Sequence, residues 1–243
     1  MTGSRAAAAV SPGPPAGVPI ALWLLPCTDD AQWLQDVIRG LAQQHSGPVF
    51  EPHITLHVGE YRQGVDTERA IGEIAALWPS LNLVARATGE SDAYYRSLYL
   101  EIADDRSDGA QLGRLRRQLV AALLDSGAAG FKITEPSGAN CAGTCHEAPG
   151  GDKGPGTAAD LDHALSCYDF RPHLSLLYGK LSQPLRAALA RRNDFSGRGI
   201  RFDRLAAVRP APGRTDLAEV ADWEVFGHRR LTAVPGRGRE RDL

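Results

Sequence analysis

The chain has 243 residues, a net charge of −2, 43% hydrophobic and 23% charged residues, which is typical of a soluble globular protein with ample length for a core. No stretch approaches the about 20 apolar residues that a membrane span requires, and the near-neutral charge provides no basic field for long nucleic acids. Four cysteines in a chain of this length do not form a secreted disulfide scaffold, so we expect a cytoplasmic protein.

The apolar pattern predicts strands alternating with helices in the first half of the chain. A short apolar run that ends at Pro26 is typical of a buried strand, and apolar residues at helical spacing follow Thr28 or Asp29. In chain order we predict a strand at 20–25, helix at 28–44, strand at 53–58, helix at 66–78, strands at 81–88 and 94–102, and helix at 108–125.

The second half repeats this order. We predict a strand at 172–178, a helix at 182–192 that Pro184 opens, and strands at 200–208 and 217–226. Each half therefore reads as strand, helix, strand, strand. This agreement predicts two lobes related by approximate two-fold symmetry, with an active cleft between them.

The segments outside these elements divide the chain into a domain and its appendages. Residues 1–18 and 235–243 are expected to be disordered tails, and the folded domain spans residues 19–234. Within it, residues 135–164 are rich in Gly and Pro, which predicts a flexible insertion between the two halves.

The halves begin with two copies of one phrase, Pro-His-Ile-Thr-Leu-His-Val-Gly at 52–59 and Pro-His-Leu-Ser-Leu-Leu-Tyr-Gly at 172–179. Side chains two apart on a strand share a face, so each copy presents an imidazole beside a hydroxyl. The pairs are His53 with Thr55 and His173 with Ser175. The alternative is that both histidines are hydrogen-bonded polar residues inside buried strands.

Two such pairs facing each other can bind and cleave a phosphodiester. Hydrolysis requires a base that activates water and an acid that protonates the departing oxygen, and histidine can serve as either near neutral pH. The hydroxyls can donate hydrogen bonds to the phosphate oxygens. This chemistry predicts metal independence and a bell-shaped pH profile. His57 has the same strand parity as His53, and we expect it in a neighbouring or rim position rather than a catalytic one.

The two phrases resemble the paired H-x-[ST]-x motifs of the two-histidine phosphoesterase superfamily, most closely the cyclic phosphodiesterases of the plant and yeast type. Three further stretches are similar to that branch: residues 22–26, residues 94–100 and Trp223. The resemblance covers about residues 20–226, is specific at the histidine motifs and loose elsewhere, and the insertion is longer than the branch leads us to expect. It implies an α+β fold whose two pseudo-symmetric lobes are each a small antiparallel sheet flanked by helices.

The resemblance also implies an activity and its residues. The activity is hydrolysis of ADP-ribose 1″,2″-cyclic phosphate, a by-product of tRNA splicing, to ADP-ribose 1″-phosphate, and of nucleoside 2′,3′-cyclic phosphates to 2′-phosphates. His53 and His173 would be the catalytic pair, Thr55 and Ser175 the phosphate binders, and Tyr178 a contact at the phosphate edge. Which histidine is base and which is acid stays open.

Two aromatic residues are further candidates for binding the substrate. Trp23 is either a wall for base or ribose stacking or a core residue, and Tyr95 is a second, weaker candidate. We expect a monomer without a metal or cofactor, whose partner is a small cyclic nucleotide and neither a long nucleic acid nor a membrane.

Other functions compatible with the sequence stay open as alternatives. One is an RNA-end phosphodiesterase or ligase of the same superfamily, which a strongly basic rim would favour and the near-neutral composition disfavours. Another is a non-catalytic module that binds nucleotides without turnover. Metal-dependent hydrolysis would need carboxylates near both motifs, whereas Glu51 and Glu60 flank only the first. A set of Cys and His residues in and after the insertion could ligate zinc, although ordinary thiols are the expected reading: Cys141, Cys145, His146, His163 and Cys167.

Overall fold

The computed structural model describes residues 18–61, 65–103, 111–126, 158–166, 170–209, 220 and 223–232. Its strands are β1 (Val18–Pro26), β2 (Ile54–Tyr61), β3 (Leu81–Glu90), β4 (Leu98–Ala103), β5 (His173–Leu177), β6 (Gly199–Arg209) and β7 (Glu224–Arg230). Its helices are α1 (Thr28–His45), α2 (Thr67–Leu77), α3 (Gln111–Asp125), α4 (Ala158–Ser166) and α5 (Gln183–Arg192). None of these helices is long and apolar enough to cross a membrane.

The strands form one seven-stranded sheet in the order β1-β2-β5-β4-β3-β6-β7, with an additional pairing between β1 and β6. All of these pairings are antiparallel. The β1–β6 pairing closes six of the strands into a ring. Strand β6 pairs with β1 along one edge, and β3 and β7 follow each other along its other edge.

This topology confirms the predicted antiparallel α+β class but differs from the predicted division into two separate sheets. Strands β6 and β7 come from the second half of the chain, yet β6 pairs with β1 from the first half. Strand β5 is likewise flanked by β2 and β4, both from the first half. The two sequence halves are therefore interleaved, and their strands join in a single sheet.

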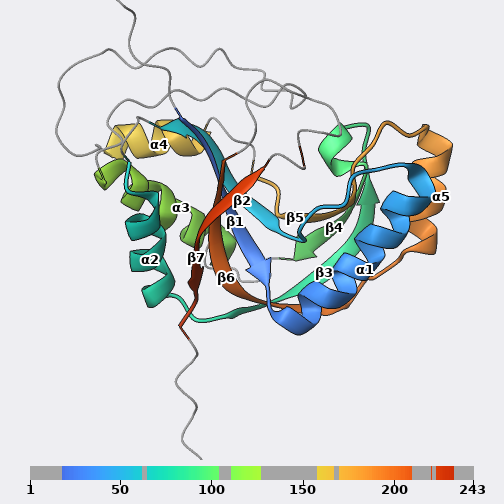
Figure 1. The fold of residues 1–243 in the computed structure, drawn as a ribbon, viewed down its shortest axis with the longest axis horizontal. Helices are drawn as coiled ribbons and strands as arrows, with labels where there is room; N and C mark the ends of the chain where they lie inside the picture. Colours follow the sequence, from blue (N-terminus) through green and yellow to red (C-terminus); the bar gives the residue numbers. More distant parts are fainter. Residues whose placement is uncertain are drawn as a thin grey trace, which may run out of the picture.

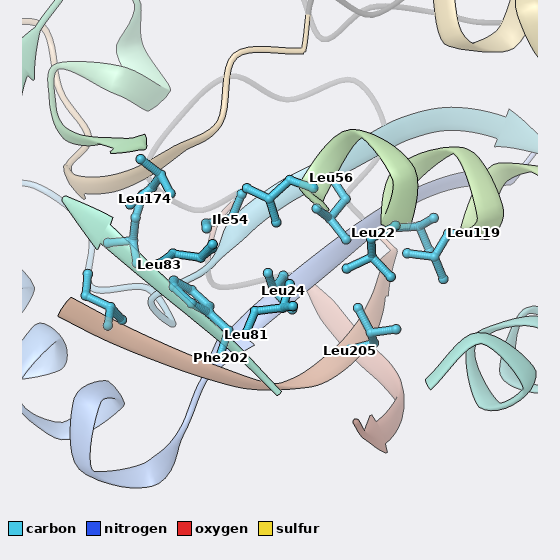
Figure 2. Close-up of a cluster of buried hydrophobic side chains, with 14 of the residues drawn as sticks. Leu22, Leu24, Ile54, Leu56, Leu81, Leu83, Leu119, Leu174, Phe202 and Leu205 are labelled. Atoms are coloured by element: carbon cyan, nitrogen blue, oxygen red, sulfur yellow. The ribbon is translucent and has the colours of Figure 1, made fainter. Parts of the chain in front are cut away.

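A hydrophobic core fills the space inside the ring and under the helices. Figure 2 shows side chains from β1, β2, β3, β5, β6 and α3 pointing toward one another. The labelled residues are all buried: Leu22, Leu24, Ile54, Leu56, Leu81, Leu83, Leu119, Leu174, Phe202 and Leu205. Burial of such side chains contributes about 1.5–3 kcal/mol each, so the strands that carry the two motifs are anchored from the core side.

The helices lie at two ends of the sheet, with α2, α3 and α4 at one end and α1 and α5 at the other (Figure 1). Local sequence explains their limits. The Asp66 side chain accepts a hydrogen bond from the backbone N–H of Arg69 and so caps α2. Helix α1 ends at Ser46, whose φ of 54° is left-handed, and a proline in the first turn opens α5.

Three segments differ from the predicted elements. Residues Tyr94–Arg96 form a 3-10 turn, so β4 starts at Leu98 and not at residue 94. The last strand was predicted at 217–226 and covers Glu224–Arg230, while residues 217–219, 221 and 222 lie outside the described residues. Helix α4, which begins within the predicted insertion and ends two residues beyond it, was not predicted.

Candidate functional site

The two repeated phrases lie side by side in the sheet. Strands β2 and β5 run antiparallel, and Ile54 is the register partner of Leu174. Each of these residues directly follows the histidine of its phrase. His53 and His173 are thus brought together from positions 120 residues apart in the chain, and a charge on His173 affects the ionisation of His53.

The first phrase contains a β-bulge immediately after its hydroxyl residue. Thr55 is opposite Trp23 in β1, whereas His57 is opposite Leu22, so Leu56 is the extra residue. Opposite residues in an antiparallel pair share a face. Thr55 therefore shares a face with Trp23, and His57 shares the other face with Leu22.

The second phrase contains a bulge at the equivalent position. Ser175 is opposite Tyr99 in β4, whereas Leu177 is opposite Leu98, so Leu176 is the extra residue. The repeat of the sequence is therefore also a repeat of the backbone. In both copies the bulge separates a histidine–hydroxyl face from a core face.

The bulge corrects the expected position of His57. Simple alternation placed His57 on the face of His53, but the extra residue Leu56 turns it to the opposite, fully buried face. It occupies the place that Leu177 has in the second copy. Burial, followed by the charge of Arg116, lowers the pKa of His57 to about 3. His57 is therefore a neutral core residue outside the site.

The two motif histidines share one hydrogen-bonding arrangement. Nδ1 of His53 lies 2.6 Å from the carbonyl oxygen of Glu51, and Nδ1 of His173 lies 2.8 Å from that of Arg171. A carbonyl oxygen only accepts, so Nδ1 carries the proton and donates in each case. This fixes the tautomer and leaves Nε2 as the nitrogen that can exchange a proton with a substrate.

Both histidines have a depressed pKa. The pKa of His53 is lowered to about 4, first by burial and then by the charge of His173, against the opposing effect of its bond to Glu51. Burial also lowers the pKa of His173, with a smaller contribution from the charge of Arg96. His53 is 6% exposed and His173 is half-buried. Of the two, His53 is the one more firmly held in its neutral form.

The two hydroxyl residues differ in their hydrogen bonding. The Ser175 hydroxyl donates to the carbonyl oxygen of Tyr95 at 2.8 Å. No such bond is formed by the Thr55 hydroxyl with any residue that the structure describes. The Thr55 hydroxyl can thus donate its proton to a ligand, whereas the Ser175 hydroxyl can do so only after its hydrogen bond to the Tyr95 carbonyl is broken.

Trp23 packs directly against the first motif histidine. Its ring stacks on the His53 imidazole, with centroids 3.7 Å apart and planes within 9°. Trp23 is only 3% exposed and also contacts Trp223 edge-on at 5.6 Å. One face of the indole is therefore occupied by the histidine, so the ring orients His53.

The other predicted aromatic residues gather at the end of the second phrase. Tyr178 is 3% exposed and stacks on Phe50, with ring centroids 3.8 Å apart. Tyr95 lies edge-on to Tyr178 at 5.3 Å, and Trp223 is 6.4 Å from it. Phe50 also lies 6.4 Å from His53. Tyr178 and Tyr95 are thus joined to the histidine site through an aromatic cluster.

Two residues beside His173 were not predicted. The Tyr99 ring is edge-on to the His173 imidazole at 5.6 Å, in the place equivalent to that of Trp23 in the first copy. The Arg96 guanidinium lies over the Tyr99 ring, 5.4 Å from its centroid. Both belong to a stretch whose resemblance was noted, but only the strand register reveals which residue faces the hydroxyl.

The described residues also bear on the metal alternatives. No three His, Cys, Asp or Glu side chains among them are grouped so that they could hold a metal ion. Cys141, Cys145, His146 and Cys167 lie outside the described residues. Metal independence therefore stays a prediction.

The chain is similar to one described family and to several solved structures. The model of the family described as "Cyclic phosphodiesterase-like protein" matches residues 18–194, well over half of the chain. No curated protein matches the chain. The solved structures similar to it include a phosphoesterase (14% identity, 88% of this chain and 99% of that chain, TM-score 0.45). They also include Escherichia coli LigT complexed with 3′-AMP (14%, 89% and 99%, TM-score 0.45) and with ATP (16%, 89% and 99%, TM-score 0.44).

Proposed function

The chain belongs to the cyclic phosphodiesterase-like family of two-histidine phosphoesterases, and from this premise we propose that it hydrolyses small cyclic phosphodiesters without a metal ion. The proposed substrates are ADP-ribose 1″,2″-cyclic phosphate, opened to ADP-ribose 1″-phosphate, and nucleoside 2′,3′-cyclic phosphates, opened to 2′-phosphates. The observation that carries the proposal is the pairing of the two motif strands, which joins His53 and His173 at Ile54 and Leu174.

The environments of the two imidazoles favour a division of roles. His53 is the more buried and has the pKa of about 4, so it is the histidine that starts neutral and acts as the general base. His173 is half-buried, and the negative charge of a bound phosphate raises the pKa of a nearby imidazole. His173 therefore takes up a proton as the substrate binds and acts as the general acid.

In this scheme the reaction proceeds by an in-line displacement at phosphorus. Nε2 of His53 removes a proton from water as the water oxygen forms a bond to phosphorus. The bond from phosphorus to one ring oxygen breaks, and Nε2 of His173 gives its proton to that oxygen. For a 2′,3′-cyclic phosphate the departing oxygen is O3′, which leaves a 2′-phosphate. Thr55 donates to a non-bridging oxygen and helps to hold the charge of the transition state.

The substrate proposal is tested by product analysis in excess chelator. The purified chain is incubated with ADP-ribose 1″,2″-cyclic phosphate and, separately, with a nucleoside 2′,3′-cyclic phosphate, and the products are identified by 31P NMR. We expect a 1″-phosphate and a 2′-phosphate. A folded protein that opens neither compound would contradict the proposal and would direct the search to RNA ends or to binding without turnover.

A further inference from the structure

The His173 side of the site does not have the free hydroxyl that the His53 side has. Thr55 and Ser175 are equivalent in the repeat, but the proton of Ser175 is committed to the carbonyl oxygen of Tyr95. Of the two motif hydroxyls, that of Thr55 is therefore the one with a proton to offer to a phosphate held between the two histidines. A donor for the phosphate on the side of His173 has to come from another residue.

Arg96 is a cation beside His173 with no anionic partner among the described residues. Its Nε atom is buried and has no hydrogen-bond partner, and no residue that the structure describes forms an ion pair with its guanidinium. The nearby carboxylate of Glu90 is already paired with Arg186 at 2.6 Å. Glu101 is the register partner of His173 and forms no ion pair with Arg96. A partly buried cation without a counterion favours the binding of an anion.

The turn that carries Arg96 is attached to the second phrase at three points. Ser175 donates to the Tyr95 carbonyl, and the backbone N–H of Gly179 donates to the Tyr94 carbonyl at 3.0 Å. The Ser97 hydroxyl donates to the carbonyl oxygen of Gly179. These bonds hold the turn Tyr94–Arg96 at a fixed position beside β5. Arg96 is thus preorganised relative to His173 and does not belong to a freely moving loop.

The ring of Tyr99 fixes the direction of the guanidinium. Tyr99 is the register partner of Gly89, and a Cβ atom added there would lie 2.6 Å from the ring. Only glycine leaves room for the ring at this place. The ring is edge-on to the His173 imidazole at 5.6 Å, and the Arg96 guanidinium lies over it, 5.4 Å from its centroid. A cation over an aromatic face is stabilised.

We propose that Arg96, held over Tyr99 beside His173, binds a non-bridging oxygen of the substrate phosphate. It thereby supplies on the His173 side the donor that Thr55 supplies on the His53 side. The ligand class is a phosphate or phosphodiester anion, which guanidinium recognises through charge-assisted hydrogen bonds. The inference rests on the proposed function for the identity of the substrate, but not for the binding of the anion.

The test separates anion binding from turnover. Inorganic phosphate is titrated into the wild type, Arg96→Gln, Arg96→Lys and the control Arg114→Gln, and the imidazole resonances are followed by NMR. Arg114 is an exposed arginine of α3 that forms no ion pair with the residues that the structure describes. We expect Arg96→Gln to weaken phosphate binding by about 10-fold or more, because a charged hydrogen bond is lost. Arg96→Lys retains part of the affinity, and Arg114→Gln retains all of it.

The same variants are then assayed with a nucleoside 2′,3′-cyclic phosphate. If the wild type turns it over and Arg96→Gln binds phosphate within twofold of the wild type, the inference is wrong and the proposed function stands. If phosphate binding depends on Arg96 but the wild type opens no cyclic phosphate, the inference stands and the proposed function fails. Absence of phosphate binding to the wild type overturns the inference.

Discussion

At the scale of the residue, the chemistry is set by what each imidazole and hydroxyl is bonded to. Both motif histidines donate from Nδ1 to a backbone carbonyl two residues earlier, so Nε2 is the atom that exchanges protons in the proposed mechanism. The depressed pKa of each means that both are neutral in the free protein at neutral pH. A neutral pair suits the uptake of one proton together with an anionic substrate.

The expected pH dependence of kcat/KM follows from the lowered pKa values of His53 and His173. It reports the free protein, in which the proposed roles require His53 to be neutral and His173 to be protonated. We expect an acid limb near pH 4 from His53 and an alkaline limb below the ordinary histidine value of 6.5 from His173. Stopped assays between pH 3.5 and 8 measure the profile. A maximum above pH 7 would contradict this assignment.

The two hydroxyls are expected to respond differently to removal. Thr55→Val keeps the shape but removes the proton donor, so we expect kcat to fall by about 10- to 100-fold with unchanged stability. Ser175→Ala removes the bond to the Tyr95 carbonyl and should cost about 1 kcal/mol of unfolding free energy. Steady-state kinetics and urea unfolding of both variants test this; equal losses of kcat with no loss of stability would show that Ser175 also binds the phosphate.

At the scale of the element, the bulges explain how one phrase serves both the site and the core. Each bulge turns the residue after the extra leucine inward, where His57 and Leu177 lie. On the other edge of β4, Gly89 leaves room for Tyr99. The direction of Tyr99, and of Arg96 above it, therefore depends on the sheet around them.

A pair of glycine substitutions tests whether Gly89 in β3 is needed to leave room for the Tyr99 ring. In Gly89→Ala the new Cβ would lie 2.6 Å from the Tyr99 ring and displace it, whereas nothing lies within 4 Å of the equivalent atom in Gly40→Ala. We expect Gly89→Ala to raise KM and to weaken phosphate binding, as Arg96→Gln does. Gly40→Ala, in α1, should keep both and gain up to about 1 kcal/mol of stability. Unchanged KM in Gly89→Ala would separate Tyr99 from substrate binding.

The strands and helices of the core could be predicted from periodicity, and the histidine pair from the repeat, because both signals are local in sequence. The position of His57 could not, because a bulge depends on the register with β1. The segment Tyr94–Arg96 was predicted as strand but forms a turn. Its Arg96 and Tyr95 carbonyls accept hydrogen bonds from the Ser91 and Ser175 side chains, and these contacts cannot be inferred from the apolar pattern. Arg96 was not predicted as a site residue, because its place beside His173 depends on this turn.

At the scale of the whole molecule, the ring of strands joins the two halves and buries His53, His57 and, in part, His173. A histidine whose pKa is lower in the folded state than in the unfolded state binds protons preferentially when unfolded. The resulting loss of unfolding free energy is absent above the unfolded pKa of about 6.5 and grows as the pH falls toward the folded pKa. We therefore expect the unfolding free energy to decrease from pH 6.5 toward pH 4.

His57→Leu tests this account away from the site. Leucine is the residue at the equivalent position of the second copy. With a folded pKa of about 3 for His57, we expect the substitution to remove about 3 kcal/mol of the loss in unfolding free energy between pH 6.5 and 4. Urea unfolding at both pH values measures the difference. Because His57 lies on the core face, kcat/KM should stay within about twofold of the wild type; an unchanged pH dependence would contradict the burial argument.

The central claim is that two histidines from separate halves of the chain form one catalytic pair. The most direct measurement is turnover of a nucleoside 2′,3′-cyclic phosphate in excess chelator by the wild type, His53→Ala and His173→Ala, with folding checked by circular dichroism. We predict that either substitution lowers kcat by about 10²- to 10⁴-fold, which is the usual contribution of a general acid or base. Wild-type turnover that survives in either folded variant would contradict the claim.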